Sequence, residues 1–283
     1  MAITLSPSDL DIVDALTQSW VTTGSATLSS SVQTDWCYGN VGSRHYTATA
    51  EVNGEVVLAR WPRIKQRNRG FDREISQHMI AAAHGLSPSI LASDWNNQAL
   101  LMPYLKPSVI SWRDATTTLR AVHALPQTAP RLNITHAMNY WFDRAPKQPW
   151  ETQQQHNLTR WAEALFAAHQ HDAVFSHGDY SVSNVLRNPR GRCVVIDWEY
   201  ACVAPRWWDL AILCQTEQLP AEKRRSLLAQ YWRRSPSAKE LETLSAFIDV
   251  YTQLLALWTA ATATGNTVYD AITLTDQPII AGR

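Results

Sequence analysis

The chain has 283 residues and no net charge at neutral pH, because 25 basic residues balance 25 acidic ones. Hydrophobic residues make up 45% of it and charged residues 18%, which is typical of a globular protein with a sizeable core. A neutral chain lacks the positive field that attracts nucleic acid or an anionic membrane, so we expect neither as a partner.

The N-terminal segment carries no export signal, since no basic start is followed by a long apolar stretch. No apolar run reaches the roughly 18 residues of a membrane span, so we expect a cytoplasmic protein without membrane insertion. The first predicted element is a helix. It starts at the capping sequence Ser6-Pro7-Ser8-Asp9 and continues with apolar residues at helical spacing from Leu10 to Trp20.

Residues 46 to 104 have the pattern of a small sheet with one helix packed on it. The predicted elements are a hairpin from Tyr46 to Arg60 around an Asn53-Gly54 turn, a helix from about Phe71 to Ala83, and apolar strands at 89–92 and 99–104. Asn-Gly is the dipeptide that a tight hairpin turn prefers. Gly85 and Pro88 mark where the helix ends.

Beyond Pro107 the apolar residues recur at helical spacing. The predicted helices are Thr117–Leu125, Thr152–His169, Ala221–Tyr231 and Lys239–Ala263. We therefore expect an α+β fold of two lobes, with a β-rich nucleotide-binding lobe at 1–104 and a larger helical, catalytic lobe at 105–283. Small ligands commonly bind in the cleft between two such lobes, so we expect the active site there.

One stretch of the helical half carries a set of residues suited to phosphoryl transfer. His177-Gly178-Asp179 is followed by Asn184, and Asp197 ends a buried strand. Two aspartates and an amide are the minimum set for metal-assisted transfer: Asp179 would accept the proton of the attacking hydroxyl, and Asn184 and Asp197 would hold Mg²⁺. Each residue alone is typical of a turn or a strand end, but a hairpin between 185 and 196 brings the last two together.

The sequences HGDYSVSNVL and VVIDWEYACVAPRWWDLA, which span residues 177–186 and 194–211, resemble the aminoglycoside phosphotransferase and choline kinase superfamily. IDWEYA followed by WDLA is most similar to its bacterial choline kinase and thiamine kinase branch. The resemblance covers nearly the whole chain. It implies a protein-kinase-like fold and a kinase that uses ATP and Mg²⁺.

The resemblance also implies roles for residues near the motif. Asp179 would be the catalytic base and His177 would orient its loop, although a buried structural histidine is an equal alternative. Asp209 matches the acid that braces the catalytic loop. Glu199 would be a second metal or substrate contact, with an exposed strand-end glutamate as the alternative.

In the first lobe, Arg60 matches the cation that holds the nucleotide phosphates, and Glu74 on the next helix would pair with it. The alternative for both is a surface ion pair. A phosphate-covering loop would run through Gly39, Asn40, Gly42 and Ser43, with an ordinary turn as its alternative. Met102 and Tyr104 lie in the segment that would contact adenine.

The acceptor is predicted to be a small cationic alcohol such as choline or thiamine. Aromatic rings stabilise such cations, and the helical half is rich in them: Tyr140, Trp141, Trp150, Trp207, Trp208 and Trp258. Glu199, Trp207 and Trp258 are the candidate substrate contacts, although a core role is the alternative for each ring. Two rival functions stay open, an aminoglycoside phosphotransferase and a nucleotide-binding pseudokinase without activity. The oligomeric state is left undetermined.

Overall fold

A computed structural model describes residues 7–22, 37–38, 45–52, 54–63, 69–145 and 152–263. The chain divides into two compact units. The first comprises Met1–Ser108 and Leu186–Ile196, and the second comprises Val109–Val185 and Asp197–Arg283. The chain thus leaves the first unit after residue 108 and returns to it for eleven residues.

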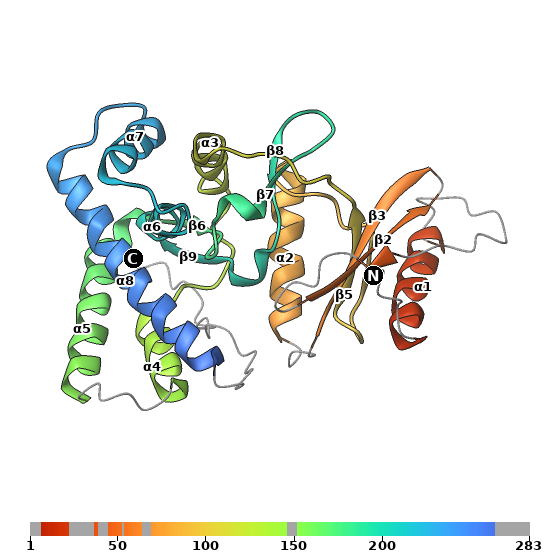
Figure 1. Ribbon diagram of the computed structural model, residues 1–283, viewed down its shortest axis with the longest axis horizontal. Helices are drawn as coiled ribbons and strands as arrows, with labels where there is room; N and C mark the ends of the chain where they lie inside the picture. The colour runs from red at the N-terminus through yellow and green to blue at the C-terminus, as the bar shows by residue number, and fades with distance from the viewer. Residues whose placement is uncertain are drawn as a thin grey trace, which may run out of the picture. The chain divides into compact units, whose positions relative to one another are not determined.

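The first unit is built on an antiparallel sheet with the strand order β1-β2-β3-β5-β4 (Figure 1). Its strands are β1 (Cys37–Tyr38), β2 (His45–Val52), β3 (Glu55–Pro62), β4 (Ala92–Asp94) and β5 (Ala99–Pro103). The β2–β3 hairpin confirms the pattern of alternating residues around Gly54, which has a φ of 80°. The strand predicted at 89–92 is shifted, because β4 begins only at Ala92.

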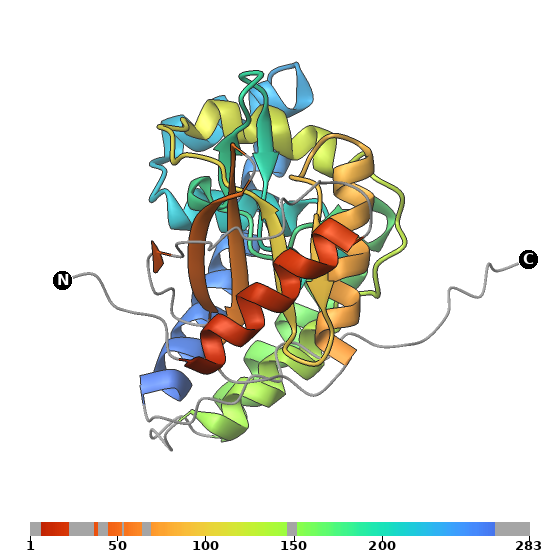
Figure 2. The same cartoon turned by 90° about the vertical axis from the view of Figure 1, so that its right-hand side faces the viewer.

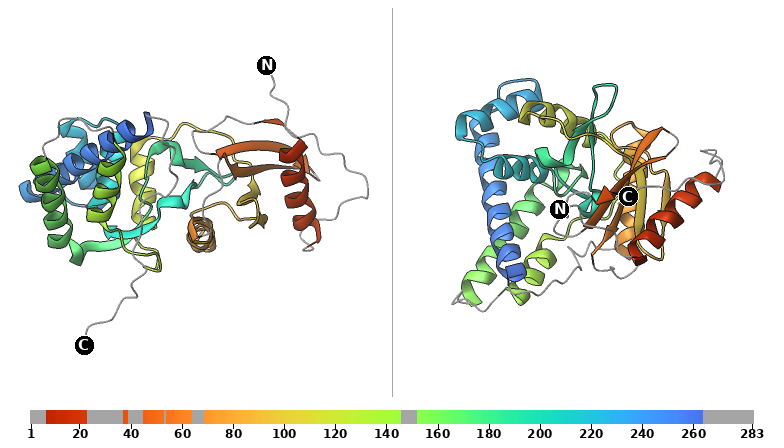
Figure 3. Two further views of the ribbon diagram at one scale, coloured as in Figure 1. Left: turned by 90° about the horizontal axis from the view of Figure 1, so that it is seen from below. Right: turned by 45° about the vertical axis from the view of Figure 1, so that its right-hand side comes forward.

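Two helices cover opposite faces of this sheet. Helix α1 (Pro7–Thr22) crosses one face, as Figure 2 shows, and in Figure 3 the sheet lies between α1 and α2 (Arg69–Ala83). Neighbouring strand residues point to opposite faces, so Leu101 packs in the cluster with α1 while Leu100 packs with Ile75 of α2. Each helix therefore closes its own apolar core.

The hairpin of β7 (Val185–Arg187) and β8 (Cys193–Val195) is attached to the first unit by backbone pairing. The Val195 N–H donates to the Leu86 carbonyl at 2.7 Å. The Ser87 hydroxyl donates to the Val195 carbonyl at 2.9 Å. These bonds hold the strand that leads to Asp197.

The second unit consists mainly of helices. They are α3 (Trp112–Val122), α4 (Ile134–Arg144), α5 (Thr152–Ala168), α6 (Trp207–Thr216), α7 (Ala221–Trp232) and α8 (Ala238–Ala263). The short strands β6 (Ala173–Ser176) and β9 (Cys202–Pro205) pair antiparallel in the same unit. Helices α5, α7 and α8 confirm the sequence pattern, whereas α4 and α6 were not predicted.

The helix predicted to begin at Thr117 begins five residues earlier. Ser111 and Asp114 form a capping box, in which the Ser111 hydroxyl accepts from the Asp114 N–H at 3.1 Å and Asp114 accepts from the Ser111 N–H. This reciprocal pair satisfies N–H groups that would otherwise be unpaired at the helix start. The predicted end at Leu125 is also wrong, because the helix stops at Val122.

Helix α8 is long and apolar enough to cross a membrane by length and composition alone. An 18-residue window within Ala238–Thr262 has a mean hydropathy of 1.2, and 44% of that window is buried inside the protein. Buried residues such as Phe247 and Val250 pack within the second unit, where α8 contacts α4 and α6. A core helix has the same composition, so this feature is weak evidence for a membrane span.

Candidate active site

The loop that begins after β6 is held in place by a buried carboxylate. Asp209, in the first turn of α6, is fully buried, and its two oxygens accept the N–H of His177 at 2.8 Å and of Gly178 at 2.9 Å. This is the bracing contact expected of Asp209 from the sequence. The first two residues of the His-Gly-Asp motif are therefore tied to α6.

A third bond reaches the same carboxylate from α3. His123 Nε2 lies 3.0 Å from Asp209 Oδ2. Burial by itself would raise the pKa of Asp209, but the hydrogen bond from His123, the electrostatic influence of the His123 and His177 rings and the Gly178 N–H together lower it. Asp209 is therefore an ionised acceptor at neutral pH.

Gly178 is the position at which the loop passes closest to another backbone. Its φ is +80°, and a Cβ built there would lie 2.2 Å from the Tyr200 carbonyl oxygen. Both the left-handed conformation and the close approach require glycine. The glycine of the His-Gly-Asp motif thus lets the loop pack against residue 200.

Asp179 and Asn184 are joined directly. The Asn184 Nδ2 donates to the Asp179 carbonyl at 2.9 Å and lies 3.4 Å from the Asp179 carboxylate. Because the amide nitrogen faces Asp179, the Asn184 Oδ1 is the atom left to coordinate a cation. A 3₁₀ turn, η2 (Val182–Asn184), places Asn184 directly before β7.

His177 is fully buried and lies within the loop instead of facing a substrate. Its Nδ1 accepts the Asp179 N–H at 3.3 Å, and its ring packs edge-on against Tyr180 and Trp198. These contacts make His177 a buried structural histidine. The same contacts favour the predicted role of orienting the loop. The side chain positions Asp179 through its backbone.

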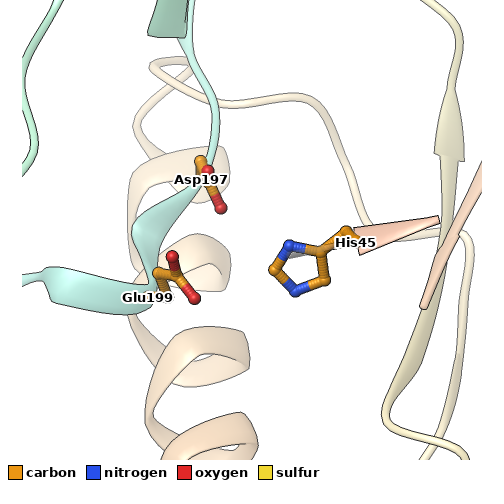
Figure 4. A group of neighbouring side chains, drawn as sticks. All are labelled: His45, Asp197 and Glu199. Carbon is orange, nitrogen blue, oxygen red and sulfur yellow. The ribbon is translucent and has the colours of Figure 1, made fainter. Parts of the chain in front are cut away.

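Asp197 follows β8 in a left-handed conformation, with φ 70° and ψ 64°, and a 3₁₀ turn, η3 (Trp198–Tyr200), comes next. This geometry directs Asp197 and Glu199 to the same side of the chain, as Figure 4 shows. Their carboxylate oxygens lie within 4.8 Å of each other. His45, also labelled there, belongs to β2 of the first unit.

The oxygen donors of the second unit fit a magnesium ion. Asn184 directly precedes strand β7, and Asp197 follows its paired strand β8. Both residues therefore lie at the same open end of the hairpin. Amide and carboxylate oxygens are the ligands that Mg²⁺ prefers. Glu199 adds a second carboxylate beside Asp197.

The nucleotide-binding residues predicted in the first unit are only partly described. Arg60 on β3 and Glu74 on α2 form the predicted ion pair, with side-chain exposures of 12% and 6%. The pair is thus mostly buried and does not match the surface alternative. The predicted phosphate loop, with Gly39, Asn40, Gly42 and Ser43, lies outside the described residues.

The segment predicted to contact adenine is largely engaged in the sheet. Met102 is 7% exposed and packs with Leu100 and Phe71. The Tyr104 N–H donates to the Val56 carbonyl at 2.9 Å. A nucleotide contact by Tyr104 would have to use its carbonyl or its side chain.

Most of the predicted aromatic residues belong to the core. Trp207 is 4% exposed and packs edge-on against His169 and Trp232, which favours the core alternative. Trp141 and Trp208 are equally buried, and Arg144 lies 3.5 Å from the centre of the Tyr140 ring. Trp258 is partly exposed, and Trp150 lies outside the described residues.

Three residues near the loop carried no functional signal in the sequence: His123, Tyr231 and Tyr251. Tyr251 lies on α8 with its ring edge-on to Trp208 at 5.5 Å. Burial and the charges of Asp179 and Asp209 together raise the pKa of Tyr251. Its phenol is therefore within electrostatic range of Asp179.

Comparison with known proteins identifies the family. Residues 39–247 match the model of the phosphotransferase enzyme family. The chain belongs to this family. The match includes the Asp179 loop, the hairpin and Asp209, so this phosphotransferase is a small-molecule kinase. No match was found among curated protein sequences.

Solved structures show the fold of this phosphotransferase. A choline/ethanolamine kinase family protein from Mesorhizobium loti is 18% identical, with a TM-score of 0.68 over 90% of this chain and 88% of that chain. A choline kinase from Streptococcus pneumoniae is 15% identical, with a TM-score of 0.64 over 93% and 94%. A macrolide 2'-phosphotransferase of type I is 18% identical, with a TM-score of 0.59 over 94% and 95%. The α+β, protein-kinase-like fold expected from the sequence is thus confirmed.

Proposed function

We propose that this phosphotransferase moves the γ-phosphate of ATP to the hydroxyl of a small cationic alcohol such as choline or thiamine. The observation that carries the proposal is the arrangement of Asp179, Asn184 and Asp197. Asn184 is bonded to Asp179 and precedes one strand of the β7–β8 hairpin, and Asp197 follows the other. This arrangement would provide a base beside a cation site.

Asp179 accepts the proton of the attacking hydroxyl, and a base held in this way contributes ~10²–10⁴-fold to the rate. Its position is set by the Asn184 amide and by the backbone bonds from His177 and Gly178 to Asp209. Mg²⁺, when bound, would neutralise the charge of the nucleotide phosphates. Asn184 and Asp197 would hold it, with Glu199 beside them.

The choice of a nucleotide and a cationic alcohol is supported by the fold neighbours. They include choline and ethanolamine kinases, and one choline kinase structure contains AMP. Among the aromatic residues of α8, Tyr251 and Trp258 keep some exposure, whereas Phe247 is buried. An aromatic face stabilises a quaternary ammonium or thiazolium ion by ~0.5–2 kcal/mol.

The test is a coupled assay of ADP release with ATP and Mg²⁺ and a panel of acceptors. The panel contains choline, ethanolamine, thiamine, an aminoglycoside, a macrolide and an uncharged sugar. We expect turnover on a cationic alcohol, and no turnover with any acceptor when Asp179→Asn replaces the wild type. Turnover on the uncharged sugar alone would disprove the cationic substrate.

A second candidate is phosphorylation of an antibiotic, because macrolide and aminoglycoside phosphotransferases are also fold neighbours. The same panel separates the two candidates. Expression of the protein in a susceptible bacterium adds a second readout. Unchanged susceptibility to both drug classes would count against antibiotic phosphorylation.

A further inference from the structure

A continuous buried chain of polar groups runs from the catalytic loop to α7. Asp209 accepts from the loop and contacts His123 Nε2 at 3.0 Å. On the other side of the ring, His123 Nδ1 lies 2.6 Å from the Tyr231 hydroxyl. Asp209, His123 and Tyr231 are 0%, 9% and 4% exposed, so water has little access to these bonds.

The direction of each bond follows from what its atoms can donate. Asp209 has a lowered pKa and accepts only, so the proton of a neutral His123 ring lies on Nε2. Nδ1 is then an acceptor and takes the Tyr231 O–H. Burial raises the pKa of Tyr231 to about 12, so its hydroxyl keeps that proton at neutral pH.

Arg206 supports the same direction. Its positive charge lies close enough to Tyr231 to oppose partly the rise in the pKa of that phenol. A guanidinium can only donate hydrogen bonds, so Arg206 cannot take the Tyr231 proton. That proton therefore remains for His123. The hydrogen-bonded chain runs from Tyr231 through His123 to Asp209.

The helix that carries Tyr231 is attached to α3 beside His123. Gln230 Nε2 donates to the Arg113 carbonyl at 2.7 Å and contacts the Thr117 hydroxyl at 2.8 Å. The Tyr231 and His123 rings are also packed edge-on, with centroids 5.6 Å apart. The phenol therefore has a fixed position relative to the imidazole.

We propose that Tyr231 is a positioning residue for phosphoryl transfer. Its hydroxyl holds the His123 proton on Nε2, and that proton keeps Asp209 in the orientation that binds the N–H groups of His177 and Gly178. Without the phenol, His123 can take the other tautomer, and its bond to Asp209 is lost. The inference rests on the proposed role of Asp179, which follows Gly178 directly.

The first experiment measures the kinetics of Tyr231→Phe, which removes the hydroxyl and keeps the ring. We expect kcat to fall about tenfold, while KM for ATP and for the acceptor stays within about twofold, because the loop geometry changes and the binding residues do not.

A control variant on α7 separates positioning from a general loss of stability. Leu228→Ala removes buried apolar volume from α7 and leaves all the polar groups of the chain in place. At a temperature where both variants are folded by circular dichroism, Leu228→Ala should keep its kcat. Equal losses of kcat in Tyr231→Phe and Leu228→Ala would overturn the proposal, as would a wild-type kcat in Tyr231→Phe.

The proton position is read directly by ¹H–¹⁵N NMR of the histidine rings, with His123 assigned by comparison with His123→Asn. The wild type should show a neutral ring protonated on Nε2. In Tyr231→Phe we expect a mixture of tautomers and shifted amide signals for His177 and Gly178. An unchanged spectrum, or a doubly protonated ring in the wild type, would overturn the proposal.

The NMR readout needs no turnover, so it tests the role of Tyr231 independently of the proposed function. A wild-type protein that is inactive on every acceptor would disprove the proposed function. The NMR comparison would still test whether Tyr231 controls His123 and the loop.

The double variant Tyr231→Phe/His123→Asn tests the route from the phenol to the loop. Its kcat should equal that of His123→Asn alone if the phenol acts through the imidazole. A further loss of kcat in the double variant would overturn that route.

Discussion

At residue scale, Gly178 is the position of the loop with no room for a side chain. Gly178→Ala would force a Cβ to within 2.2 Å of the Tyr200 carbonyl oxygen at a φ of +80°. We expect kcat to fall by at least about 100-fold, because the backbone that carries Asp179 must move. Gly191→Ala is the matched control.

Gly191 has nearly the same φ, +75°, but its Cβ would meet nothing within 4 Å. That variant should lose only about 1 kcal/mol of stability, the usual cost of a left-handed residue other than glycine, and keep its kcat. Steady-state kinetics and urea denaturation of both variants test this pair. A fully active Gly178→Ala enzyme would show that the loop tolerates the displacement.

Asp179→Asn keeps the size of the side chain and removes the base. We expect kcat to fall ~10²–10⁴-fold, while the increase in melting temperature on adding ATP and Mg²⁺ is retained. Asp172→Asn is the control, because Asp172 is a partly exposed acid paired with Arg206 in the same unit. Loss of nucleotide stabilisation in Asp179→Asn would point to a binding role instead.

At the scale of elements, α2 is tied to β3 by one mostly buried ion pair. Removing one partner of such a pair leaves the other charge buried, so Glu74→Ala should cost about 3–5 kcal/mol. The denaturation midpoint in urea measures this loss. Glu240→Ala breaks the exposed Arg234–Glu240 pair and the bond from the Ser237 N–H at the start of α8, and should cost only about 1 kcal/mol.

Element prediction succeeded where one face of a helix or strand is polar. Helices α5 and α7 and the β2–β3 hairpin have such a face, and their residues showed the matching period. Helix α6 does not, because every residue from Trp207 to Cys214 is buried. A helix surrounded by protein has no polar stripe, so its period cannot be detected in the sequence. Helix α4 begins directly after the capping residue Asn133. In a sequence, one capping residue alone is only a weak sign of a helix start.

At the scale of the whole molecule, the buried Asp209 should control acid stability. Its pKa is lowered on folding, so the folded state binds its proton less readily than the unfolded state. The stabilisation is fully present above the unfolded pKa of about 4 and is lost as the pH falls through the lower folded value. Asp209→Asn lacks this contribution.

The free energies of unfolding of wild type and Asp209→Asn should therefore differ by a constant amount above about pH 5 and converge below about pH 4. Denaturation in urea across this range measures the difference. Repeating the denaturation at 1 M salt separates the contribution of Asp209 from that of Glu240, because salt screens only exposed charges. The exposed Arg234 lowers the pKa of Glu240 to about 2. A difference that stays constant down to about pH 3 would contradict the expectation.

The sequence by itself determined the class of reaction and predicted the residues that carry it. Asp179, Asn184 and Asp197 stand in one short stretch, where the hairpin between them sets their geometry locally. Arg60 and Glu74 form the ion pair that the family resemblance implied.

Only the tertiary structure revealed what holds the loop from behind. His123 lies 86 residues before Asp209, and Tyr231 lies 108 residues beyond His123, with no motif at either position. Contacts over such distances depend on how α3, α6 and α7 pack, and that packing is decided by apolar surfaces. The proposed base could be predicted from local spacing, whereas the residues that hold its loop in place were decided by the packing of the folded core.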